Sequence, residues 1–169
     1  MKQFLRIASV ALLSVLVLSA CGFRLRGTGP QPVLPFKTLF LSVAEGSPIA
    51  VPLRRNLDAM SNIEIVSDRK QADAALEVLN EGRDKQVLSL NSQGRVREYT
   101  LLYRANFRVV DKEGRQLLAP TELVIRRIQS FNESQVLAKE AEEATLYREM
   151  QSDLVQQVLR RISAIKPVQ

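Results

Sequence analysis

The chain carries few side chains that could catalyse a reaction. It has no histidine and one cysteine, Cys21. Histidine is the commonest general base near neutral pH, and its absence excludes Ser-His and Cys-His nucleophiles. The sequence also lacks the phosphate-binding patterns GxxxxGK[ST] and GxGxxG. The carboxylates Glu140, Glu142 and Glu143 are more simply explained as the solvated face of a helix. We therefore expect no enzyme, no cofactor and no metal site.

The residues before Cys21 indicate export. Residues 1–20 begin with a basic stretch, continue with an uncharged apolar run at residues 7–18, and end in Ala20. This order is typical of a secretory signal peptide. An uncleaved membrane anchor is the alternative, but the apolar run is shorter than the ~20 residues that a spanning helix needs.

Cys21 itself has three possible fates in an exported protein. It could pair with another chain, remain a free thiol, or carry lipid. The sequence LSAC at residues 18–21 resembles the lipobox of bacterial lipoproteins, in which the cysteine becomes the N-terminus and carries acyl chains. We therefore predict cleavage between Ala20 and Cys21 and attachment to the membrane through acylated Cys21, because several chains on one residue anchor stably. Gly22 stands where inner-membrane lipoproteins of enteric type usually carry Asp, which favours the outer membrane and a periplasm-facing domain.

Arginine is the side chain best suited to bind an anion in this sequence. Removal of residues 1–20 takes away two of the 24 basic residues and leaves 22 against 18 acidic ones. This small excess suits contact with anionic lipid or a polyanionic sugar, and with export it disfavours nucleic acid. Guanidinium groups can hold phosphate or carboxylate through two hydrogen bonds. Six of them could gather near one sheet face and one turn, unless they form an ordinary solvated face: Arg95, Arg97, Arg104, Arg108, Arg126 and Arg127.

The elements that must position these arginines are visible in the middle of the chain. Residues 98–110 alternate apolar and polar side chains, which predicts a long strand with one buried face. Polar turns that end in glycine flank it at residues 91–94 and 111–114, so we expect a three-stranded antiparallel meander. Pro120 predicts an edge position or a bulge in the third strand, because proline has no amide hydrogen to donate. The predicted buried set is Tyr99, Leu101, Tyr103, Ala105, Phe107 and Val109.

The flanking segments predict further elements. Residues 37–43 are rich in β-branched and aromatic side chains, as strands are, whereas residues 63–66 form a short strand or lead into the next one. Ser47 predicts the start of an amphipathic helix that runs to about Met60. A longer helix is expected over residues 132–165, because apolar side chains recur there every three or four positions.

These elements predict the class of fold. Two helices with apolar stripes must cover one face of a sheet, which gives an α+β two-layer sandwich in the order β-α-β-β-β-α. The sheet is expected to have four strands and to be antiparallel or mixed, since the first strand could pair in parallel. We predict a removed signal peptide at residues 1–20, a lipidated N-terminus and proline-rich tether at 21–36, and one globular α/β domain at 37–166.

Three segments carry a resemblance to a known family. CGFRLRG at residues 21–27 resembles the start of the mature LPS-assembly lipoproteins, the LptE family. GRVREYTLLYRANFRVVD resembles the central strand of that family, and AKEAEEATLYREMQSDLVQQVLRRI resembles its C-terminal helix. The likeness extends over the mature chain in the same order of elements. Within the first segment the family motif falls on Cys21, Gly22, Phe23, Leu25 and Arg26.

The resemblance implies a role at the Gram-negative outer membrane. Members of the family plug the barrel protein LptD, help assemble lipopolysaccharide into the outer leaflet, and bind lipopolysaccharide themselves. One basic residue associated with that binding corresponds to Lys139. A second basic position aligns with Ser92, so the charge would have to come from Arg95 or Arg97. The alternative is a scaffold lipoprotein of another envelope complex, without a lipid ligand.

Overall fold

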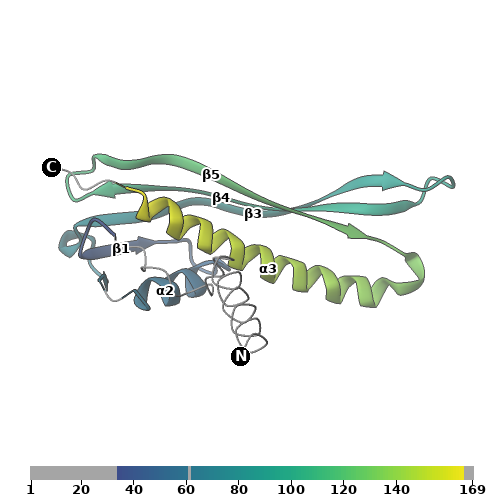
Figure 1. Cartoon of the computed structure of the whole chain (residues 1–169), viewed down its shortest axis with the longest axis horizontal. Coiled ribbons are helices and arrows are strands. Elements are labelled where there is room, and N and C mark those ends of the chain that lie inside the picture. The colour runs from purple at the N-terminus through teal and green to yellow at the C-terminus, as the bar shows by residue number, and fades with distance from the viewer. Residues whose placement is uncertain (1–33, 61, 166–169) are drawn as a thin grey trace, which may run out of the picture. The chain divides into compact units, whose positions relative to one another are not determined.

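The structure is a computed structural model that describes residues 34–60 and 62–165, all within the compact unit Pro32–Gln169. Its strands form one sheet, and its two helices form one layer against that sheet (Figure 1). In chain order they are β1 (Thr38–Ser42), α2 (Ala50–Asp58), β2 (Glu64–Val66), the 3-10 turn η1 (Arg69–Gln71), β3 (Ala74–Leu90), β4 (Val96–Asp111), β5 (Gln116–Ser130), the 3-10 turn η2 (Glu133–Gln135) and α3 (Val136–Ser163).

The meander predicted from the alternating residues is confirmed. β4 pairs antiparallel with β3 on one side and with β5 on the other. At the first turn, the side chain of Asn91 accepts hydrogen bonds from the amides of Gln93 and Arg95, and Gly94 adopts a φ of 77°. That left-handed conformation is readily reached by glycine, which is why the turn ends there. The predicted buried face of β4 is confirmed except at Tyr99, which is only half-buried; Leu101, Tyr103 and Phe107 are fully covered.

The sheet is mixed and has five strands rather than four. The strand order is β2-β1-β3-β4-β5, and β1 runs parallel to both β2 and β3. The additional strand is β2, one of the two readings left open for residues 63–66. The three residues of β2 are too few to predict a strand from their own composition. Their pairing partner, β1, lies about 26 positions earlier in the chain, with Thr38 opposite Glu64. Pro120 lies on β5, at the edge of the sheet as predicted.

Both helices pack on the same face of the sheet (Figure 1). They contribute to one hydrophobic core together with the inward side chains of the strands. α2 buries Leu53 and Leu57, and the buried stripe of α3 comprises Tyr147, Met150, Leu154, Val155, Val158, Leu159 and Ile162. Removal of such side chains from water drives the two layers together, at ~1.5–3 kcal/mol for each large apolar residue. No helix in the described part of the chain has both the length and the apolar character to cross a bilayer.

The helix starts differ from those predicted. α2 begins at Ala50, after Ile49, and no side chain among the described residues caps it. The predicted cap, Ser47, instead donates its hydroxyl hydrogen bond to Glu81 of β3. α3 begins at Val136 rather than at residue 132, because Asn132 accepts a hydrogen bond from the amide of Ser134 and so starts the separate turn η2.

Candidate functional site

A hollow of about 580 Å³, which we call the basic hollow, lies at one end of the sheet, between the β3–β4 turn and the connection from β5 to α3. It brings together two of the predicted basic residues, Arg95 and Arg97. Arg95 contacts Glu133 of η2, with 2.8 Å between Nη1 and Oε2, whereas Arg97 forms no ion pair with any described residue. The lining residues are Asn91, Gln93, Arg95, Val96, Arg97, Phe131, Asn132, Glu133 and Ser134.

Backbone and aromatic contacts join the two walls of this hollow, which are the β3–β4 turn with the start of β4 and the connection that follows β5. The amide of Phe131 donates to the carbonyl oxygen of Arg97 at 2.8 Å. The ring of Phe131 meets Tyr99 edge to face, with 5.3 Å between centroids. On the far side of Tyr99, the ammonium of Lys85 lies 4.3 Å from the ring centroid. The guanidinium of Arg97 is therefore carried by a strand that is tied to the opposite wall.

Exposed apolar side chains occur on the same elements. Leu90 at the end of β3 is 56% exposed, and Leu137 in the first turn of α3 is 82% exposed. Val87, Leu88 and Val136 are exposed too. A domain with an adequate core has no folding reason to expose this much apolar surface on the elements that also carry Arg97, which has no ion pair among the described residues. The arrangement suits a ligand that has both anionic and apolar parts.

Lys139, the third predicted site residue, lies near this end but outside the lining of the hollow. Its Nζ contacts Glu142 at 2.8 Å and the hydroxyl of Ser130 at 3.0 Å, and its side chain is only 15% exposed. The buried Gln129 donates from Nε2 to the main-chain oxygen of Lys139 at 2.7 Å. Lys139 thus joins the start of α3 to the end of β5.

The other predicted arginines do not form one basic face. Arg126 and Arg127 are adjacent on β5, so their side chains point to opposite sides of the sheet. Arg127 faces the helices and pairs with Asp153 of α3. On the opposite face, Arg108 pairs with Glu77 at 2.7 Å, and Arg104 lies 3.8 Å from Asp84.

Two carboxylates, the buried Glu77 and the half-buried Glu81, were not singled out from the sequence. Glu77 on β3 is 8% exposed and accepts hydrogen bonds from Arg69 and Arg108. Burial raises its pKa, but the two guanidiniums outweigh burial and hold the pKa below its ordinary value. Glu81 accepts from Ser47 and from Tyr103, whose pKa is raised by burial and by this carboxylate.

The position of Glu81 depends on a bulge. The register of β3 against β4 shifts between Val78 and Asn80, which moves Glu81 onto the face that carries Tyr103. Without the bulge, strict alternation would leave Glu81 on the opposite face, which Glu77 shares with Arg108. Glycine often marks a bulge in a strand, but the residue at this position is Leu79, so the sequence gives no sign of it.

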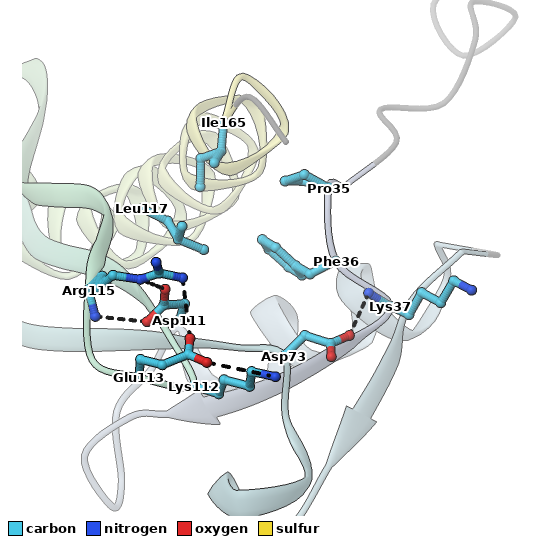
Figure 2. A pocket seen from close by; sticks show the side chains of 10 residues that line it. All are labelled: Pro35, Phe36, Lys37, Asp73, Asp111, Lys112, Glu113, Arg115, Leu117 and Ile165. Atoms are coloured by element: carbon cyan, nitrogen blue, oxygen red, sulfur yellow. Dashed lines mark hydrogen bonds and ion pairs between the residues drawn. The ribbon is translucent and has the colours of Figure 1, made fainter. Parts of the chain in front are cut away.

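A second hollow, of about 380 Å³, lies at the other end of β4 (Figure 2). Pro35, Phe36, Leu117 and Ile165 form its apolar part. Its charged groups largely satisfy one another. Arg115 contacts Asp111 at 2.6 Å, and the side chain of Asp73 accepts from the amide of Lys37 at 3.1 Å. With its carboxylates already paired, this hollow is a weaker candidate for binding a charged ligand.

The acidic segment of α3 was expected to be a solvated helix face. Two of its carboxylates, Glu142 and Glu143, pair with Lys139 and Lys85 respectively. The cleavage and acylation residues and the N-terminal family motif lie outside the described residues: Ala20, Cys21, Gly22, Phe23, Leu25 and Arg26.

A family model described as LptE, lipopolysaccharide-assembly, matches residues 36–162. The LPS-assembly lipoprotein LptE of Yersinia enterocolitica is 32% identical over 154 residues, which cover 90% of this chain and 73% of that protein. The protein of the same name from Pectobacterium atrosepticum is 29% identical, over 90% of this chain and 82% of its own length.

Solved structures show the same fold. The solution structure of the uncharacterized lipoprotein B from Nitrosomonas europaea has a TM-score of 0.73 at 37% identity, covering 85% of this chain and 91% of that one. The crystal structure of the rare lipoprotein B from Shewanella oneidensis has a TM-score of 0.67 at 26% identity, covering 76% and 95%. The family match spans the sheet and both helices, including the walls of the basic hollow. The chain belongs to the LptE lipopolysaccharide-assembly family.

Proposed function

We propose that this protein is an outer-membrane lipoprotein that binds lipopolysaccharide and forms a complex with the lipopolysaccharide-assembly barrel LptD, which it plugs. Membership of the LptE family supports this role. The structural observation that carries the binding part is the basic hollow, in which Arg97 has no carboxylate partner among the described residues. The role requires recognition and assembly, and it requires no catalytic group.

The chemistry of lipopolysaccharide fits this end of the fold. Its phosphates and sugar carboxylates are anions that guanidinium groups can hold bidentately. Its acyl chains are apolar and would gain from contact with exposed side chains such as Leu90 and Leu137. Arg97 and Arg95 are therefore proposed to contact the anionic groups. Lys139, whose Nζ is engaged by Ser130 and Glu142, is proposed to contribute indirectly from the neighbouring turn of α3.

The proposed attachment to the membrane rests on the N-terminal sequence. Residues 1–20 would be removed, Cys21 would be acylated, and residues 21–36 would tether a domain at residues 37–166. Leu34 and Phe36 are buried in the core of the domain, so the extended part of the tether would end before Leu34 rather than at residue 36. Proline-rich segments extend by about 3.1 Å per residue, so residues 28–33 would span roughly 19 Å. That reach would let a periplasm-facing domain stand clear of the lipid headgroups.

Charge reversal tests the binding site. In the triple variant Arg95→Glu, Arg97→Glu and Lys139→Asp, we expect lipopolysaccharide to bind at least about tenfold more weakly, because cationic contacts become repulsive. Titration of the purified protein with lipopolysaccharide in detergent measures the affinity.

The matched control reverses three exposed arginines elsewhere: Arg54, Arg126 and Arg160, none of which pairs with a described residue. The control changes the net charge by the same amount and should keep most of the affinity. Equal weakening of both triple variants would mean that binding follows net charge alone. Unchanged binding in the first variant would reject the site and favour the scaffold alternative.

A further inference from the structure

We propose that Gln129 and Lys139 are positioning residues, which clasp the first turn of α3 to the end of β5 and thereby hold one wall of the basic hollow. The wall is the connection at residues 131–135. The inference rests on the proposed binding of lipopolysaccharide at this hollow. It assigns to Lys139 an indirect part in that binding, and it adds Gln129 and Ser130 to the residues on which binding depends.

Gln129 is a buried amide whose side chain makes one hydrogen bond among the described residues, to α3. It is 1% exposed, and its Nε2 donates to the main-chain oxygen of Lys139 at 2.7 Å. Its Oε1 is buried and has no hydrogen-bond partner among the described residues. A buried amide that is only half satisfied is less favourable than an apolar side chain of equal size. We therefore attribute the presence of an amide at this buried position to its hydrogen bond with α3, which joins α3 to β5.

Lys139 makes the complementary contact with its side chain. Its Nζ has three hydrogens to donate, and two are directed to Ser130 Oγ and Glu142 Oε2, at 3.0 and 2.8 Å. With a side chain 15% exposed, Lys139 presents little of its charge to a ligand in the hollow. Its geometry is better suited to holding Ser130 than to binding a phosphate.

The two contacts close a short loop of chain. Residues 129 and 130 lie at the end of β5, residue 139 lies in the first turn of α3, and the wall lies between them. The wall is also held from the other side, because Phe131 donates to the carbonyl oxygen of Arg97. Within the wall, Glu133 contacts Arg95. Release of the clasp would therefore loosen the segment that orders Arg95 and faces Arg97.

Neutral variants separate positioning from direct contact. Gln129→Met and Ser130→Ala each remove one arm of the clasp and leave the charge of Lys139 in place. If the clasp positions the wall, each should bind lipopolysaccharide about fivefold more weakly, the effect expected for one lost hydrogen bond. If Lys139 instead contacts the lipopolysaccharide directly, its release from Ser130 should leave the affinity unchanged or raise it, and the proposal would be wrong.

Gln156→Met is the matched control for Gln129→Met. Gln156 Nε2 donates to Asn56 Oδ1 at 3.1 Å and joins α3 to α2 rather than to the wall. Its loss removes a comparable contact between elements. We expect lipopolysaccharide affinity to be unchanged in this variant. Equal weakening by both substitutions would indicate a general loss of order and would overturn the assignment to Gln129.

Amide hydrogen exchange of the mature acylated protein supplies a second measurement that needs no ligand. The amides of Phe131, Ser134 and Gln135 donate hydrogen bonds in the wall, so they should exchange faster in Gln129→Met and Ser130→Ala. In Arg97→Glu they should remain protected while lipopolysaccharide binding falls. Unchanged protection in Gln129→Met would overturn the clasp, even if binding weakened.

The two proposals can therefore fail separately. If the parent protein does not bind lipopolysaccharide, the proposed function fails, and the exchange rates still decide whether the clasp holds the wall.

Discussion

Glu77 shows how one side chain ties separate parts of this fold together. It lies on β3 and accepts hydrogen bonds from Arg69 of η1 and Arg108 of β4. Its side chain is only 10% exposed, which disfavours the ionised carboxylate. The carboxylate stays ionised because the guanidiniums of Arg69 and Arg108 both pair with it. The three residues therefore form a unit in which the removal of one member leaves the others poorly satisfied.

The charge of Glu77 predicts a pH dependence of stability. Its pKa in the folded protein lies below the ordinary value of 4.5, because the bonds from Arg108 and Arg69 outweigh the effect of burial. The stabilisation is therefore complete above about pH 4.5 and is lost as the pH falls through the lower, folded pKa. Glu77→Gln should lower the free energy of unfolding by about 1–3 kcal/mol at pH 7.

Urea denaturation at pH 7 and at pH 3 measures this difference. The parent protein should lose more stability on acidification than Glu77→Gln, so the difference between the two proteins should be smaller at pH 3 than at pH 7. Other carboxyl groups titrate equally in both proteins and do not affect the comparison. Parallel pH profiles would contradict the assignment.

At the scale of elements, the three long strands depend on the two turns that reverse them. Gly94 and Gly114 end these turns with φ values of 77° and 84°. Gly82 lies in the middle of β3 without a positive φ, and an added Cβ would meet nothing within 4 Å. The same residue type is thus required at two positions and is replaceable at a third.

Alanine substitution distinguishes these roles. Gly94→Ala should lower the free energy of unfolding by about 1–2 kcal/mol, because a Cβ is unfavourable at positive φ. Gly82→Ala, the matched control, should be neutral or stabilising by up to about 1 kcal/mol, because alanine loses less backbone entropy in a strand. Thermal and urea denaturation of both variants measures the effects. A loss of stability in Gly82→Ala as large as that in Gly94→Ala would show that turn conformation is not the cause.

At the scale of the whole molecule, the two ends of β4 differ in character. The basic hollow lies at its start, and the described chain begins at Leu34, close to the charged but self-paired hollow at its end. Sixteen residues of strand separate these ends by about 50 Å. An anchored protein of this build could hold the basic end far from its point of entry into the domain.

The proposed complex predicts the behaviour of the protein on extraction. Mild detergent should release the mature protein, cut from a 19.0 kDa precursor chain, together with a β-barrel protein of several times its mass. Affinity purification at native expression, followed by mass spectrometry, identifies the partner. Recovery of the lipoprotein alone would contradict the plug role, and recovery with a different envelope complex would favour the scaffold alternative.

The parts of the fold that the sequence predicted are those set by local pattern. The alternation from residue 98 to 110 defined the buried face of β4, and the turns at residues 91–94 and 111–114 defined its neighbours. The contacts that were not predicted join distant residues. Neither the pairing of β2 with β1 nor the contact between Glu77 and Arg69 has a local signal.

The candidate site divides in the same way. Arg95 and Arg97 could be placed beside a turn from the sequence, because the turn and strand have clear patterns. The resemblance identified Lys139 without showing what it contacts. Its engagement with Ser130 and Glu142 depends on where α3 begins, and that start was displaced by the turn at Asn132. Small errors in an element boundary therefore change the predicted role of a side chain.

The position of β5 at the edge of the sheet has a consequence for the protein before it meets any partner. An edge strand of fifteen residues offers backbone hydrogen-bonding groups to any other exposed strand, and such contacts begin aggregation. Pro120 interrupts the row of donors, and the charged side chains of Glu122 and Arg126 would oppose a like neighbour. These side chains therefore disfavour the addition of another strand to the long open edge of β5.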